Sequence, residues 1–143
     1  MKRTLIMLTL GMLVASAAAQ SIAERLARID KGSWGSIGDT GTRCQALFDQ
    51  LTAKYHVTEL ELADKIVYIT QKLLGDKYGI RQLNRETMED VNLIAPPQPR
   101  NIRNLTKLLV IYAGLRNQGN SREAAVRKLN VSLQLNPHAL DSL

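Results

Sequence analysis

The stretch from Thr58 to Gly75 constrains the fold most, because its hydrophobic pattern is typical of an amphipathic helix and of no strand. Wound at about 100° per residue, its apolar side chains fall on one arc and its charged ones on the other. The apolar arc comprises Leu62, Ala63, Ile66, Val67, Ile69, Leu73 and Leu74. Thr58 and Glu61 have the spacing of a capping box, and Gly75 can end the helix in the left-handed conformation. So wide an apolar face needs other helices to cover it.

The N-terminus has the composition of an export signal. Lys2 and Arg3 precede an apolar run from Leu5 to Val14, and small residues follow as far as Ala19. The run is about half as long as the 20 residues that a membrane-spanning helix needs. We therefore expect a signal peptide at residues 1–19 and, after its cleavage, no stable insertion in a membrane. Residues 20–143 would form a single domain in the periplasm or outside the cell.

Further segments with helical spacing predict the rest of the fold. They lie at about 22–30, 42–54, 84–94, 100–117 and from 121 towards Pro137, and most begin with a capping residue such as Thr42 or Asn84. Gly32 to Gly41 reads as a loop, whose Trp34 either packs on the core, as we favour, or is an exposed contact for a sugar or a partner. Only residues 55–57 separate two helices, which predicts an antiparallel hairpin. Without a convincing strand, the chain is expected to be all-α, a compact bundle of five or six helices.

Glycine spacing at Gly114 to Ser121 is similar to that of a phosphate-binding loop. The lysine that such a loop uses to reach the phosphates is replaced by Asn120, and the parallel sheet that such a domain needs is not predicted. We therefore interpret the segment as a turn between two helices. No other cofactor motif is found, so no cofactor is predicted.

Cys44, the only cysteine, begins an apolar series at helical spacing that continues with Leu47, Phe48, Leu51 and Tyr55. This places Cys44 on the buried face of a helix as an inert thiol, with an intermolecular disulfide as the alternative. His56 follows that helix in a short connection. Because it has no second ligand at helical spacing, we expect a solvated residue and no metal site.

Residues 106–139 resemble a single tetratricopeptide repeat. The resemblance rests on Leu109, Tyr112 and Ala113 in the first helix and on Ala125, Leu129, Ser132 and Pro137 in the second. Leu109, Ala113 and Arg116 stand where the family usually has an aromatic, a glycine and a second aromatic residue, and no second copy is found upstream, whereas such arrays stack at least about three. The resemblance implies a helical hairpin and, at most, protein binding.

Two groups of charged residues are candidate functional sites. Glu86, Glu89 and Asp90 cluster on one helical face, which is typical of a solvated surface; paired carboxylates such as Glu86 and Glu89 could also hydrolyse a glycan. Arg100, Arg103 and Lys107 recur at spacings of three and four and would form one ridge on a helix. This ridge is either a solvated surface or a docking site.

The ridge belongs to the basic part of the chain. Residues 20–98 contain ten Lys or Arg against eleven Asp or Glu, whereas residues 99–143 contain seven against two. An acidic protein or an anionic envelope polymer is the expected partner, and export disfavours nucleic acid. We interpret the chain as an exported helical binding protein, such as an inhibitor, an immunity protein or an accessory subunit of an envelope complex. A small cell-wall glycan hydrolase is the alternative.

Overall fold

The computed structural model describes residues 21–34 and 40–141, and these ranges contain helices and no strand. The elements are α2 (Ile22–Trp34), α3 (Thr40–Tyr55), α4 (Glu59–Val67), the π-helix η1 (Tyr68–Lys77), α5 (Asn84–Asn92), α6 (Ile102–Asn117) and α7 (Arg122–Leu135). The predicted all-α bundle is thereby confirmed. The predicted signal peptide at 1–19 lies outside the described residues, and so does the Trp34 side chain.

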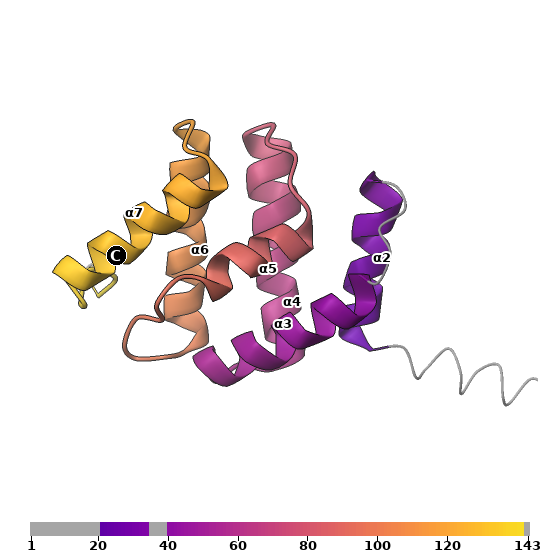
Figure 1. The fold of residues 1–143 in the computed structure, drawn as a ribbon, viewed down its shortest axis with the longest axis horizontal. Helices are drawn as coiled ribbons and strands as arrows, with labels where there is room; N and C mark the ends of the chain where they lie inside the picture. The colour runs from indigo at the N-terminus through magenta and orange to yellow at the C-terminus, as the bar shows by residue number, and fades with distance from the viewer. Residues whose placement is uncertain (1–20, 35–39, 142–143) are drawn as a thin grey trace, which may run out of the picture.

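The helices form two layers that cross (Figure 1). In this view α2, α4 with η1, and α6 stand roughly upright, and each contacts the next, while α3, α5 and α7 run obliquely across them and also contact one another in sequence. The hydrophobic core includes Phe48, Ile66, Met88, Leu109 and Leu129. Ile66 and Leu109 are 0% exposed, as their places on the apolar arcs predict.

The loop predicted from Gly32 to Gly41 is shorter than the sequence indicates. Helix α2 continues to Trp34, and α3 already begins at Thr40, so Thr42 is a helical residue and not the residue before the helix. Glycine in a helix costs about 1 kcal/mol relative to alanine. Helices α2 and α3 pack against each other, and tertiary packing of this kind routinely overrides helix propensity.

Helices α3 and α4 do not form the antiparallel hairpin that their short connection predicts. Figure 1 shows α3 crossing α4 at a steep angle. His56, between them, has a φ of 53° and is exposed, which confirms a solvated position. Connections of three or four residues also join helices at about 90–120°, and the left-handed turn at His56 gives the chain that direction.

Thr58 starts α4 as predicted, but the helix does not end at Gly75. The Glu61 N–H donates to the Thr58 hydroxyl at 3.2 Å, and the Thr58 N–H donates to the Glu61 carboxylate at 2.9 Å. From Tyr68 the backbone widens into η1, which continues to Lys77, and Gly79, with a φ of 67°, takes the left-handed position. π-Helical segments are rare and occur frequently at functional sites.

Asp30 of α2 caps α5, although the sequence predicts Asn84 as the cap. Asn84 is instead the first helical residue, and the Asp30 carboxylate accepts the backbone N–H groups of Asn84 at 2.9 Å and of Arg85 at 3.0 Å. Burial raises the pKa of Asp30, while these backbone hydrogen bonds oppose the rise. A carboxylate from a distant helix therefore satisfies donors that a local cap would ordinarily serve.

Candidate binding surface on helices α6 and α7

A groove of about 550 Å³ lies between α6 and α7, and we call it the α6–α7 groove. Its walls are mainly apolar: Ile111 and Leu115 of α6, Leu133 of α7, and Leu140 of the C-terminal segment. Arg127 and Lys128 lie at its edge, and both are exposed. The groove thus combines an apolar floor with a positively charged border.

The turn between the helices positions the two walls. Gly119, with a φ of 90°, reverses the chain, and the Ser121 side chain caps α7 by accepting the Ala124 N–H at 3.1 Å. The segment interpreted as a turn between helices, Gly114 to Ser121, does join two helices, but Gly114 to Asn117 form the end of α6 and only the residues after Asn117 make the turn. Figure 1 shows α7 starting beside the end of α6 and running obliquely away from it, and the C-terminal segment supplies the remaining wall.

The predicted ridge of Arg100, Arg103 and Lys107 is only partly on a helix. Helix α6 begins at Ile102, and the Asn101 side chain caps it by accepting the Asn104 N–H at 2.9 Å, so Arg100 precedes the helix. Burial raises the pKa of Tyr55 in α3, and the nearby charge of Arg100 opposes this rise. The sequence missed this boundary because Pro99 suits a first helical turn as well as the segment before one.

Arg103 and Lys107 do share a ridge, and it leads into the groove. They precede Ile111 and Leu115 at steps of four residues, which places all four side chains along one face of α6. Arg103 is exposed. The Lys107 ammonium donates to the Leu140 carbonyl, so Lys107 holds the C-terminal wall in place and is not a freely exposed cation.

The remaining cations of the ridge and the groove edge lie outside the ion pairs of the described residues. Arg103 of the ridge and Arg127 and Lys128 of the groove edge take part in none of these pairs. Two apolar side chains of α7 are also exposed, Val131 at 48% and Leu135 at 83%. Apolar surface bordered by unpaired charge is typical of a docking site for another macromolecule.

The carboxylates considered for glycan hydrolysis surround Arg122, a residue that the sequence reading did not connect with them. The Arg122 guanidinium donates to Asp90 twice at 2.9 Å, to Glu89 at 3.2 Å and to Glu86. Glu89 also accepts from Arg85. Glu89 borders a hollow that Glu86 does not line, so the two carboxylates do not face a common cleft there. This geometry favours a structural role, joining α5 to α7.

Tyr112 and Gln82 extend this network into the core. The Tyr112 hydroxyl donates to Asp90 and accepts the Gln82 side-chain N–H at 3.0 Å. Burial, together with the hydrogen bond to Asp90, raises the pKa of Tyr112. Burial lowers the pKa of the Arg122 guanidinium, but the hydrogen bonds that it donates to Asp90 and Glu89, with the charges of Asp90 and Glu86, outweigh burial and raise this pKa. A tyrosine on the apolar face of a central helix signals such a partner in the sequence.

Cys44 is fully buried in α3, as its spacing predicts. Burial, with a smaller effect of the Asp30 charge, raises the pKa of its thiol to about 11. A thiol that stays protonated is a poor nucleophile.

Comparison with protein-family models, with curated proteins and with solved structures found no match. In the described ranges, no helix combines the length and the apolar character that crossing a membrane requires. The geometry of the α6–α7 groove therefore carries the functional inference by itself.

Proposed function

We propose that the protein is an exported binding protein whose α6–α7 groove docks an acidic, amphipathic segment of a partner protein. An inhibitor, an immunity protein or an accessory subunit of an envelope complex would work in this way. The signal-like composition of residues 1–19 supports export. The single observation that carries the proposal is an apolar groove bordered by Arg127 and Lys128, which have no ion-pair partner in the described part of the chain.

Charge and polarity together select this class of occupant. Apolar side chains at helical spacing could fill the groove, and flanking carboxylates could pair with Arg103, Arg127 and Lys128. An anionic envelope polymer would use the cations but would leave the apolar walls exposed to water. The repeat-like helical pair at 106–139 remains a resemblance, and what it implies, protein binding, agrees with this proposal.

A defined peptide tests the proposal more sharply than capture of an unknown partner. The probe is a synthetic helical peptide with Leu at positions i, i+3, i+4 and i+7 and Glu at the flanking positions. We expect saturable binding, with amide chemical-shift changes centred on Ile111, Leu115 and Leu133. A peptide with Ser at the Leu positions keeps the charge and should bind at least tenfold more weakly.

Two variants separate docking in the groove from simple charge attraction. Ile111→Glu places a negative charge in the groove, which would repel the Glu side chains of the peptide, and should abolish binding of the Leu/Glu peptide. Val110→Glu, at an exposed neighbouring position, should have little effect. Equal binding of the Leu and Ser peptides, or of poly-glutamate, would instead indicate attraction of anionic polymers. No saturable binding of either peptide would overturn the proposal.

A further inference from the structure

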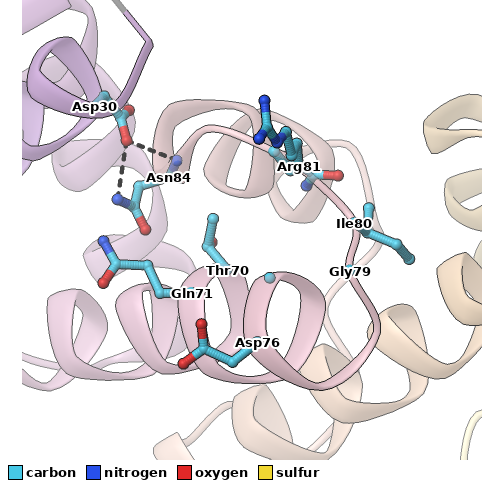
Figure 2. Close-up of a pocket in the computed structure, with 10 residues that line it drawn as sticks. Asp30, Thr70, Gln71, Asp76, Gly79, Ile80, Arg81 and Asn84 are labelled. Carbon is cyan, nitrogen blue, oxygen red and sulfur yellow. Dashed lines mark hydrogen bonds between the residues drawn. The ribbon is translucent and has the colours of Figure 1, made fainter.

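A second hollow, of about 590 Å³, shares no lining residue with the α6–α7 groove (Figure 2). It lies between η1, the segment 79–84 and Asp30 of α2. Its polar lining includes the buried side chains of Asp30, Thr70, Gln82 and Asn84, the half-buried Gln71 and the exposed Asp76. A polar floor that is buried needs a hydrogen-bond partner for each of its groups.

One of these groups has no partner. The Oδ1 atom of Asn84 is buried and accepts no hydrogen bond in the described part of the protein, although Asn84 is only 2% exposed. The Asn84 side-chain N–H donates to Asp30 at 2.9 Å. Because an ionised carboxylate can only accept, the amide nitrogen must face Asp30 and the oxygen must face away from it.

Figure 2 shows where this oxygen points. The Asn84 oxygen is turned from Asp30 towards Gln71 and Thr70, into the hollow. The Thr70 hydroxyl is already paired with the Thr87 hydroxyl at 2.7 Å. A buried acceptor without a donor is unfavourable, and it marks a position where a bound molecule could supply an N–H or O–H group.

The charge at the floor of the hollow favours a cationic donor over an anion, because Asp30 lies there and forms no ion pair within the described residues. Asp76 lies at the rim, where it forms an exposed ion pair with Lys72 at 3.1 Å. Arg81 also lines the hollow, but it is exposed, unlike Asp30. We propose that the hollow binds the primary ammonium group of a small polar molecule, which donates to Asn84 Oδ1 at the floor and attracts the Asp76 carboxylate at the rim. This site is independent of the proposed docking function.

Ethanolamine and choline form a matched pair of probes, because both carry a positive charge and the same alcohol but only ethanolamine has N–H donors. In an amide-resolved NMR titration of the full chain, we expect saturable ethanolamine shifts at Gln71, Gly79 and the Asn84 side chain. The dissociation constant should be millimolar, as for other molecules of this size. Choline should produce no saturable shift at these positions.

Variants locate the site. Asn84→Ala should abolish ethanolamine binding, but it also removes a hydrogen bond to Asp30 and could perturb α5. Asp76 is exposed, and Asp76→Asn should weaken binding two- to fivefold, which corresponds to the free energy of about one surface ion pair. Asp64→Asn, an exposed carboxylate of α4 outside the hollow, should leave binding unchanged. Equal responses to choline and ethanolamine, or to Asp64→Asn and Asp76→Asn, would overturn the proposal, as would no saturable ethanolamine shift.

Discussion

Among the side chains that the structure describes, Arg122 makes the most concentrated set of polar contacts. It joins α7 to Glu86, Glu89 and Asp90 of α5, and Asp90 is nearly buried. Removing one member of a buried ion pair costs more than the pair itself contributes, because the remaining charge loses its compensation. Without Arg122, the Asp90 carboxylate would keep only the hydrogen bond from the Tyr112 hydroxyl among the described residues.

We therefore expect Arg122→Met to lower the free energy of unfolding by about 3 kcal/mol. Chemical denaturation followed by circular dichroism measures this loss. Arg127→Met, which changes an exposed arginine of the same helix, should alter stability by no more than about 0.5 kcal/mol. Similar losses in both variants would show that Arg122 contributes through its alkyl chain or through helix propensity and not through the carboxylates.

Cys44 gives the fold a measurable sensitivity to alkaline pH. Its thiol has an ordinary pKa of 9.0, and burial raises this pKa to about 11 in the folded protein. Between these values the folded state binds more protons than the unfolded state, so the free energy of unfolding falls as pH rises. The maximum slope from one thiol is about 1.4 kcal/mol per pH unit.

We expect Cys44→Ala to reduce this slope between pH 9 and pH 11, whatever its effect on stability at neutral pH. Unfolding titrations of both proteins at several pH values measure the difference. Tyr55 and Tyr112, whose pKa values burial also raises, would keep part of the alkaline loss in both proteins. Parallel pH profiles for the two proteins would mean that the thiol ionises as readily in the fold as in the unfolded chain.

At the scale of elements, the apolar arcs identify the buried face of each helix. Ile66 of α4 and Leu109 of α6 are both fully buried in the core. Truncation of either to alanine leaves a cavity, and we expect Ile66→Ala and Leu109→Ala each to cost about 2–5 kcal/mol of unfolding free energy. Leu60→Ala, at a position that is 60% exposed in α4, is the control and should cost far less. Unchanged unfolding midpoints in both core variants would contradict the assignment of the faces.

Element type and capping were predictable where the information is local. Thr58 and Glu61 lie three residues apart, so the start of α4 can be read from the sequence, and hydrophobic spacing identifies its buried face. The cap of α5 could not be read in this way, because Asp30 lies more than 50 residues before the helix that it caps. Local patterns likewise do not indicate that the backbone widens into η1 at Tyr68 or that α2 continues to Trp34.

In the candidate sites, too, local spacing predicts some features and only the fold reveals the others. Spacing places Arg103 and Lys107 on one ridge, but it cannot reveal that Lys107 is bound to the Leu140 carbonyl. The cations Arg127 and Lys128 lie on another helix, and only the packing of α7 on α6 brings them to the same groove. A site formed by two elements is thus visible only after the fold is known.

At the scale of the whole molecule, the excess positive charge lies in the C-terminal third. For binding a partner, the position of these charges matters more than their number. Of the seven cations after residue 98, Arg122 is paired with carboxylates, Lys107 with a carbonyl, and Arg116 with Gln82 and the Asn120 carbonyl. Arg100, Arg103, Arg127 and Lys128 stay exposed without an ion pair among the described residues. Of these four, Arg103 lies on the ridge of α6, and Arg127 and Lys128 line the α6–α7 groove.

We expect the triple change of Arg103, Arg127 and Lys128 to Gln to lower the association rate of the Leu/Glu peptide about tenfold at low salt, since charge steering raises association rates by at least that factor. The dissociation rate should change less. Stopped-flow measurements at increasing salt give both rates. The rate for the parent protein should fall steeply as ionic strength approaches 0.15 M, where the screening length is about 8 Å, and the rate for the variant should depend little on salt.

The control for this experiment removes the same number of positive charges from elsewhere. Arg25, Lys72 and Lys77 are exposed on α2 and η1, and none of them lines the α6–α7 groove. If the field at the groove steers the partner, their replacement by Gln should leave most of the association rate and its salt dependence intact. If net charge alone attracts the peptide, the two triple variants should slow association equally, and the basic border of the groove would be a solvated surface without a docking role.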